Sequence, residues 1–146
     1  MNPLIDDFIR SKKIAVVGMS RTGRKFGNIA GKELKAKGYD IYPVHTEAQE
    51  IDGLTCYPEL KSLSGVVDGL FISVPAWRVI PVLEDAAEMG LKRIWLQQGA
   101  WSPEVQKAIG KLNLPVVTKK CILMYAQPVR SIHKVHRTLK SIFGGL

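Results

Sequence analysis

Cysteine is scarce in this 146-residue sequence, which contains only Cys56 and Cys121. The two residues lie far apart, and neither belongs to a CxxC pair or to a Cys/His spacing typical of a metal site. A chain of this length buries roughly 70% of its unfolded surface and can fold without disulfides or metal. The composition therefore favours a reduced, cytoplasmic protein over a disulfide-rich secreted one.

Long hydrophobic runs are also missing, since no apolar segment approaches the ~20 residues that a membrane span requires. The opening residues, MNPLIDDFIR, carry Asp6 and Asp7 where a signal peptide would have an apolar core. We therefore expect neither a membrane segment nor secretion. No repeat, low-complexity stretch or long linker divides the sequence, so residues 1–146 are predicted to form one domain.

Acidic residues are outnumbered, because 13 Asp and Glu stand against 21 Lys and Arg and give a net charge of +8. This balance favours an acidic partner, such as nucleic acid, an anionic membrane surface or a small polyphosphate ligand. The basic residues are scattered along the sequence rather than clustered, which argues against the first two partners.

Short apolar runs alternate with segments of helical periodicity. The predicted strands cover residues 13–18, 39–44, 69–75, 93–97 and 114–118, and the predicted helices cover residues 26–37, 77–89 and a segment starting at Ser102-Pro103. Pro115 inside the last run predicts an edge strand, where a missing N–H is tolerated. The alternation predicts an α/β fold, a doubly wound sheet of about five mainly parallel strands with helices on both faces.

The last segment, residues 129–143, places apolar residues at helical spacing and most Lys and Arg on the other side. We interpret it as a closing helix with a solvated basic face. A homodimer contact and an anionic partner are the alternatives. Aromatic residues are not interleaved with the basic ones, so nucleic-acid binding is disfavoured.

A glycine-rich segment, VVGMSRTGRKFG at residues 16–27, joins the first predicted strand to the first helix. The N–H groups at a helix start and the positive end of the helix dipole point into such a loop, which therefore suits an anion. Gly18 permits a sharp turn, and Gly27 permits close approach of the backbone to a ligand or a strand. The residues that add charge or a hydroxyl are Ser20, Arg21, Arg24 and Lys25.

This segment nearly matches three motifs and completes none. A Walker A loop needs Ser or Thr after its lysine, but Phe26 follows Lys25, so an ATPase is disfavoured. A nucleophile elbow needs a second glycine where this sequence has Thr22. The dinucleotide motif GxGxxG comes closest, with Ser20 in place of its middle glycine. Its acid is missing, because the second strand ends Val44-His45-Thr46, so an NAD site is a disfavoured alternative.

Several segments between residues 13 and 124 together resemble the small stand-alone coenzyme A-binding domain proteins. That family has the Rossmann-like fold also found in the CoA-binding part of succinyl-CoA synthetase. The matching segments are VVGMSRTGRKFG, KGYDIYPV, CYPEL, VDGLFISVP, GLKRIWLQQGA and the cysteine of KKC. The resemblance implies coenzyme A or an acyl-CoA as the ligand. CoA has a 3′-phosphate on its ribose, which explains the missing acid, because a carboxylate there would repel it.

The resemblance also implies where the ligand lies. The loop would hold the diphosphate, the end of the second strand would border the adenosine, and the residues after the third strand would form an apolar wall. The implied contact residues are Gly18, Ser20, Arg21, Lys25, Phe26, Gly27, Pro43, Val44, His45, Val74, Pro75, Gln97 and Gly99. Ser20 and Lys25 are the best side-chain candidates for the diphosphate, and His45 is expected to stack on or hydrogen-bond the nucleotide.

The sequence departs from the family pattern in two places. Val44-His45-Thr46 stands where family members commonly have Val-Asn-Pro, and Thr22-Gly23 stands where they often have Asp-Pro. Both departures lie where the adenosine and the phosphates would touch the protein.

Few residues suggest a reaction. His133 and His136 are three apart on the predicted last helix, where a metal would need a further ligand, and we interpret them as surface residues. Cys121 follows the fifth strand, where sheets of this kind bind ligands, but a small buried residue is the preferred interpretation over a reactive thiol. No acid–base pair is evident.

We therefore predict a non-catalytic binding or sensor module for coenzyme A or an acyl-CoA, a small-molecule nucleotide ligand. One alternative is an NAD(P)-dependent oxidoreductase or another nucleotide-using enzyme, including the remnant of an acyl-CoA ligase. Another is a basic regulator that binds nucleic acid through its last helix. NAD binding with hydride transfer would favour the oxidoreductase, and steeply salt-dependent affinity for DNA or RNA would favour the regulator.

Overall fold

The computed structural model describes residues 2–126. Its central sheet contains the strands β1 (Lys13–Val17), β2 (Asp40–Val44), β5 (Gly69–Ile72), β6 (Ile94–Gln97) and β7 (Val116–Lys120). A small hairpin contains β3 (Glu50–Ile51) and β4 (Leu54–Thr55). The α-helices are α1 (Pro3–Ile9), α2 (Phe26–Ala36), α3 (Val79–Met89) and α4 (Pro103–Leu112), and 3₁₀ turns lie at Leu60–Leu63, Ala76–Arg78, Gln98–Ala100 and Ile122–Met124.

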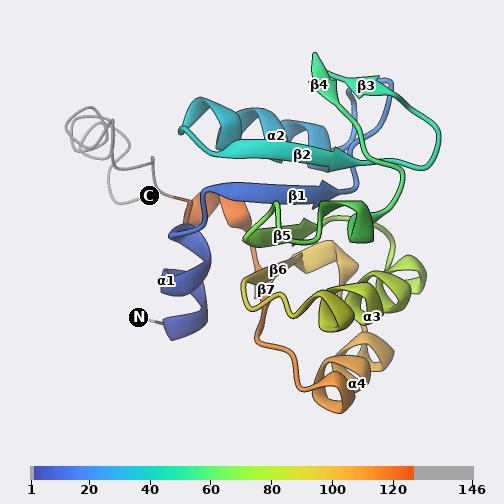
Figure 1. The fold of residues 1–146 in the computed structure, drawn as a ribbon. Helices are drawn as coiled ribbons and strands as arrows, with labels where there is room; N and C mark the ends of the chain where they lie inside the picture. The colour runs from blue at the N-terminus through green and yellow to red at the C-terminus, as the bar shows by residue number, and fades with distance from the viewer. Residues whose placement is uncertain (1, 127–146) are drawn as a thin grey trace, which may run out of the picture.

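The central strands are all parallel and are ordered β2-β1-β5-β6-β7. After β1 the chain builds β2 on one side, then returns to the other side of β1 to build β5 (Figure 1). The strand order therefore reverses between β1 and β5. Ligands of open α/β sheets bind at such a reversal, outside the carboxyl ends of the strands. The predicted doubly wound parallel sheet is confirmed, and it directs attention to the ends of β1 and β5.

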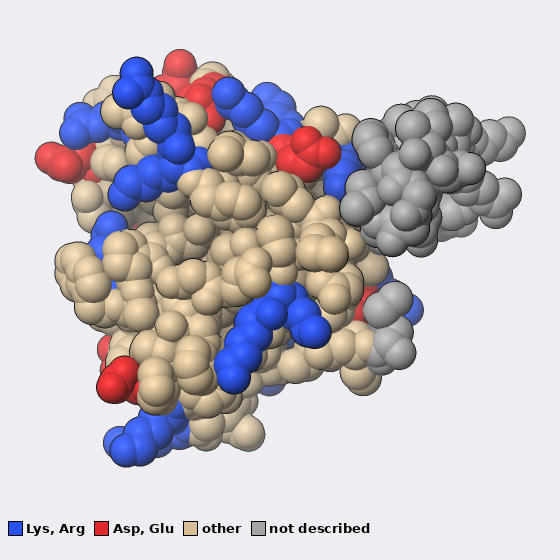
Figure 2. Space-filling model, turned by 180° about the vertical axis from the view of Figure 1, so that it is seen from behind, with Lys and Arg blue, Asp and Glu red and all other residues tan. Residues whose placement is uncertain are grey.

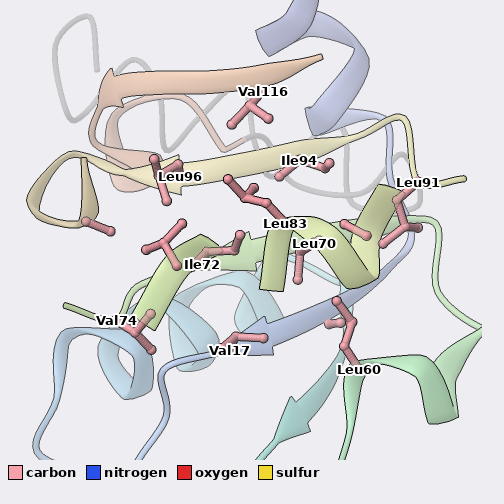
Figure 3. Close-up of a cluster of buried hydrophobic side chains, with 14 of the residues drawn as sticks. Val17, Leu60, Leu70, Ile72, Val74, Leu83, Leu91, Ile94, Leu96 and Val116 are labelled. Atoms are coloured by element: carbon pink, nitrogen blue, oxygen red, sulfur yellow. The ribbon is translucent and has the colours of Figure 1, made fainter. Parts of the chain in front are cut away.

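Helices cover both faces of the sheet, as predicted. Successive residues of a strand point to opposite faces. In β5, Leu70 and Ile72 thus join the core beneath α3 and α4, whereas Phe71 joins the core beneath α1 and α2. Figure 3 shows Leu83 of α3 reaching toward Leu70 and Ile94 of the sheet. Complete burial of one such side chain contributes about 1.5–3 kcal/mol.

Some predicted boundaries are wrong. Strand β7 begins at Val116, so Pro115 precedes the strand instead of lying inside it. Proline has no N–H to contribute to the ladder. Within residues 2–126, β7 still lies at the edge of the sheet, with β6 as its neighbour. The strand predicted over residues 69–75 corresponds to β5, which ends at Ile72. The helix predicted from residue 77 corresponds to α3, which begins at Val79 after a 3₁₀ turn.

Helix α1 and the β3–β4 hairpin are absent from the sequence-based prediction. Asn2 caps α1, since its Oδ1 accepts a hydrogen bond from the Leu4 N–H (2.8 Å), and Pro3 occupies the first helical position. The hairpin turns at Asp52 and Gly53, which both have positive φ (51° and 79°). Capping asparagine, first-turn proline and an Asp-Gly pair are signals that the sequence does contain.

The helix predicted over residues 129–143, with His133 and His136, lies outside the described residues. The homodimer contact suggested for it stays a prediction. Within residues 2–126, no helix is both long enough and apolar enough to cross a membrane.

The packing of α1 on the sheet yields a stability prediction. Phe8 is 1% exposed, and its ring meets that of Trp95 edge to face at a centroid distance of 5.3 Å. Phe8→Ala should lower the free energy of unfolding by about 3–5 kcal/mol, because it removes a buried ring and leaves a cavity. Leu4→Ala on the same helix is the control, since Leu4 is 36% exposed. Urea denaturation of both variants tests this, and equal losses would contradict the packing described.

Candidate functional site

Two glycines let the start of α2 lie directly against the end of β1. Gly18 follows β1 with φ of +134°, and a Cβ there would lie 2.8 Å from the carbonyl carbon of Ser73. A Cβ on Gly27, in the first turn of α2, would lie 2.6 Å from the carbonyl carbon of Gly18. Neither position has room for a side chain, and the φ of Gly18 is one that other residues rarely adopt.

The buried side chain of Asn28 fixes the loop between β1 and α2. Its Oδ1 accepts a hydrogen bond from the Ser20 N–H (2.9 Å), and its Nδ2 donates to the Ser20 carbonyl oxygen (3.0 Å). Nδ2 also donates to Asp52 Oδ2 (3.1 Å) in the hairpin turn. Asn28 is 0% exposed, and a buried amide left without partners would cost about 1–3 kcal/mol. One side chain therefore ties the loop, α2 and the hairpin together.

Helix α2 presents its N-terminus to the same region. Lys25 is its N-cap and makes no side-chain capping hydrogen bond, and no acidic residue lies in the first turn of this helix. The first N–H groups of a helix have no intrahelical partner, and the dipole gives them a partial positive charge. The start of α2 is therefore electrostatically suited to an anion.

A cavity of about 280 Å³ opens at this edge of the sheet, and its wall includes the ends of β1 and β2 and residues that follow β5. Its position is the reversal of strand order described above. Val17 and Val74 belong both to the cavity wall and to the core between the sheet and α3 (Figure 3). The hydrophobic core thus provides a rigid apolar side to the cavity.

Charged residues line the other parts of the wall. Lys25 comes from the start of α2 and Arg78 from the turn before α3, and Glu59 and Asp85 add acidic groups. Among residues 2–126, neither Lys25 nor Arg78 forms an ion pair. Two cations from separate elements are therefore available to one ligand in this cavity.

The acidic group of Asp85 already has a cationic neighbour. Lys61 Nζ lies 3.6 Å from Asp85 Oδ1 and donates a hydrogen bond to Glu88 Oε2 at 2.6 Å. The hydrogen bond to Glu88 is the main cause that raises the pKa of Lys61 above its ordinary value. These contacts also tie the 3₁₀ turn Leu60–Leu63 to α3 beside the cavity.

His45 follows β2 in the cavity wall and is held through both its backbone and its ring. Its N–H donates to the Tyr57 carbonyl oxygen (2.9 Å). Its Nδ1 accepts hydrogen bonds from the N–H groups of Glu47 (3.1 Å) and Ala48 (2.9 Å). Because Nδ1 is an acceptor, the proton of the neutral imidazole lies on Nε2.

The structure brings part of the predicted site together in one wall. The predicted residues that line the cavity are Gly18, Ser20, Lys25, Val44, His45 and Val74. The Ser20 hydroxyl has partners within the protein, since its Oγ lies 2.9 Å from Thr22 Oγ1 and 3.3 Å from Asn28 Oδ1. That hydroxyl therefore helps to shape the loop.

The other predicted residues lie outside the cavity wall. The exposed Arg21 lies 3.8 Å from the Glu47 carboxylate, and Phe26 packs against the core on its side of the sheet. Gln97 is buried, and its Oε1 accepts a hydrogen bond from the Ile122 N–H (3.1 Å). The remaining residues of this group are Gly27, Pro43, Pro75 and Gly99. Contact between these residues and a ligand stays a prediction.

Sequence reasoning missed Arg78 and Asn28. Arg78 lies in the segment predicted as helix 77–89, and its sequence signal is a cation placed just after the end of a buried strand. Asn28 is a polar residue on the buried face of α2, which also contains Ala30 and Leu34. A polar residue on a buried face requires hydrogen-bond partners, but the sequence does not say which.

The thiols and potential metal ligands suggest little chemistry here. Burial and, second, the Glu50 carboxylate raise the pKa of the Cys56 thiol, which therefore stays protonated at neutral pH. Cys121 follows β7 with intermediate exposure and lies outside the cavity wall. In the part of the chain that the structure describes, no three His, Cys, Asp or Glu residues are grouped to hold a metal.

The contact between Gly27 and Gly18 can be tested with a matched pair of variants. Gly27→Ala should lower stability by about 1–3 kcal/mol, because its methyl group must displace the Gly18 backbone. Gly110→Ala in α4 is the control: its Cβ would meet nothing within 4 Å, and alanine in a helix is up to about 1 kcal/mol more favourable than glycine. Chemical denaturation measures both changes, and a Gly27→Ala protein as stable as the wild type would contradict the close approach.

Comparisons with known proteins agree with this architecture. The sequence matches the family described as CoA binding domain over residues 12–127. It is 36% identical over 107 residues to an ADP-forming acetate–CoA ligase II from Archaeoglobus fulgidus, an alignment that covers 72% of this chain and 16% of that enzyme. It is 28% identical over 113 residues to the Bacillus subtilis protein YneT, covering 77% of this chain and 84% of YneT.

Solved structures give the same result. A conserved hypothetical protein from Pyrococcus furiosus has a TM-score of 0.72 and 37% identity, covering 77% of this chain and 97% of that one. A hypothetical protein from Pyrococcus horikoshii has a TM-score of 0.73 and 30% identity, and the match covers 82% of this chain and 84% of that one. The resemblance seen in the sequence is therefore confirmed, and the chain belongs to the CoA-binding domain family.

Proposed function

We propose that this protein binds coenzyme A or an acyl-CoA in the cavity beside α2, with the diphosphate on the β1–α2 loop. The observation that carries the proposal is the junction of an uncapped helix start with two cations in one cavity, Lys25 and Arg78. A diphosphate accepts hydrogen bonds from backbone N–H groups and is attracted to both cations. Membership of the CoA-binding domain family supports this ligand class.

The size of the cavity limits which part of the ligand it encloses. Its volume of about 280 Å³ is near the lower end of the ~300–1,000 Å³ typical of small-molecule sites. We infer that it holds the diphosphate and the adjoining ribose, while the pantetheine arm extends along the protein surface. The apolar wall at Val17 and Val74 then lies beside the less polar parts of the ligand.

We further propose a binding or sensor role without a chemical step. The hydroxyl of Ser20 is engaged by Thr22 and Asn28, and the thiol of Cys56 is kept protonated by burial. Neither group is arranged as an activated nucleophile, which needs a neighbouring base or a lowered pKa. The geometry therefore favours capture of the cofactor over its conversion.

A second candidate rests on the similarity to acetate–CoA ligases. The chain spans 16% of the Archaeoglobus enzyme, and it is 34% identical over 92 residues to the alpha subunit of a Pyrococcus furiosus ligase. We infer that the protein could alternatively supply the CoA-binding part of a ligase whose other parts are separate chains. Loss of ligase activity from a cell extract depleted of this protein, with recovery on adding it back, would favour this candidate.

One face of the molecule gives little support to a nucleic-acid regulator, and the last helix suggested for that role lies outside the described residues. On the face shown in Figure 2, Lys and Arg side chains lie in separate groups around a broad area of other residues. Nucleic-acid binding usually requires a continuous basic patch or stripe that follows the phosphate backbone.

A ligand screen tests the proposed function. Melting temperatures should be measured with CoA, acetyl-CoA, dephospho-CoA, NAD, NADP and ATP. At 100 times its dissociation constant a ligand stabilises by about 2.7 kcal/mol, which raises the melting temperature of a domain of this size by several degrees. We expect that increase with CoA or acetyl-CoA. A larger increase with NAD would contradict the proposal and favour the oxidoreductase.

Replacement of Lys25 locates the ligand. Lys25→Ala should weaken CoA binding by about tenfold or more, since a hydrogen bond to a charged group contributes about 1.5–3 kcal/mol. The control is Lys32→Ala, which removes the same charge from an exposed position of α2 outside the cavity wall. Isothermal titration calorimetry measures both affinities. Equal affinities for the two variants would remove Lys25 from the site.

A further inference from the structure

We propose that His45 donates a hydrogen bond from Nε2 to the 3′-phosphate of coenzyme A and so distinguishes it from dephospho-CoA. This inference rests on the proposed function, because it assigns one contact within the same cavity.

The hydrogen bonds of the free protein decide which ring nitrogen of His45 carries the proton. Two backbone N–H groups, those of Glu47 and Ala48, point at Nδ1 of His45 at 3.1 and 2.9 Å. A proton on Nδ1 would face both donors, so Nδ1 must carry the lone pair. The other nitrogen, Nε2, then carries the proton and acts as a donor. His45 lines the cavity, and within residues 2–126 the hydrogen bonds of its ring are those to Nδ1, which leaves the Nε2–H without a partner there.

The position of His45 in the fold identifies the acceptor. His45 follows the last residue of β2, and in sheets of this topology the residue at the end of the second strand contacts the ribose of a bound nucleotide. The distinctive acceptor on the ribose of CoA is its 3′-phosphate. A group that donates only is suited to a phosphate, whereas a carboxylate at this place would be suited to ribose hydroxyls and would repel it.

The cavity beside His45 contains acidic groups, Glu59 and Asp85, as well as the cations Lys25 and Arg78. The nearest acidic group in sequence, Glu47, points its carboxylate toward Arg21 at 3.8 Å, and 71% of its side chain is exposed. Thr46 also lines the cavity and adds a hydroxyl. The His45 backbone is anchored by the bond to the Tyr57 carbonyl, so backbone and ring are both ordered before the ligand arrives. Such preorganisation reduces the entropy lost on binding.

Two substitutions of His45 distinguish the role of Nδ1 as acceptor from the role of Nε2 as donor. The Oδ1 of asparagine is as many bonds from Cα as Nδ1 of histidine, so His45→Asn can accept the bonds from Glu47 and Ala48 but has no group at the Nε2 position. The Nε2 of glutamine is as many bonds from Cα as Nε2 of histidine, so His45→Gln keeps the donor and loses the acceptor of the turn. His45→Asn should therefore preserve the melting temperature, and His45→Gln should lower it.

The experiment is calorimetric titration of wild type, His45→Asn and His45→Gln with CoA and with dephospho-CoA. The wild type should bind CoA more tightly than dephospho-CoA by about tenfold or more, as expected for a hydrogen bond to a charged group. His45→Asn should lose about tenfold of that ratio, and His45→Gln should retain it. Before any ligand is added, ¹⁵N NMR of the wild-type imidazole should show the proton on Nε2.

Results that contradict this proposal can be told apart by the claim that each one overturns. An affinity for CoA that is unchanged in His45→Asn, or a proton found on Nδ1, overturns the assignment of His45 while CoA binding itself stands. Equal weakening of both ligands by His45→Asn overturns the 3′-phosphate as the acceptor. A wild-type protein that binds neither ligand overturns the proposed function together with this contact.

Discussion

The candidate site depends on the close approach of two backbone segments, the end of β1 and the first turn of α2. Gly18 and Gly27 meet there with no space for a side chain at either position. This approach places the start of α2 beside the reversal of strand order, where its N-cap Lys25 lines the cavity. A bulkier residue at Gly27 would move the helix away from the end of β1 and from Arg78 across the cavity, and one at Gly18 would collide with the backbone of Ser73.

Polar contacts then hold the loop in this arrangement. Asn28 binds both backbone groups of Ser20 and also reaches Asp52, so the β3–β4 hairpin supports a loop more than 20 residues earlier in the chain. His45 is ordered by Glu47 and Ala48 in a similar way. Each side of the site is therefore shaped by bonds within the protein, which is the condition for specific recognition at low entropic cost.

The sequence predicted the regular parts of the molecule well, for identifiable reasons. Buried parallel strands leave continuous apolar runs, and helices leave a 3.6-residue period, so the sheet and α2 to α4 were recognisable. The predicted edge position of β7 agrees with the order of the described strands, but Pro115 lies before β7 and not inside it. Asn2 is a capping signal for α1, and Asp52-Gly53 is a turn signal for the hairpin. Both signals are local, and apolar periodicity does not detect them.

The site was predicted only in part, because its geometry depends on contacts between distant residues. The glycine-rich loop and Lys25 follow from the order of the elements, and His45 follows from the family resemblance; residues of the loop, Lys25 and His45 all line the cavity. Arg78 enters that wall from an element about 50 residues after Lys25, and the hydrogen bond from Asn28 to Asp52 joins α2 to the hairpin turn. No local pattern encodes such pairings, and the family resemblance supplied the ligand class rather than these contacts.

The most direct test of this account is a crystal structure of the protein with coenzyme A bound. We expect the diphosphate to accept hydrogen bonds from the first N–H groups of α2, between Lys25 and Arg78. A structure in which the cofactor occupies another surface and leaves the start of α2 open to solvent would contradict the account.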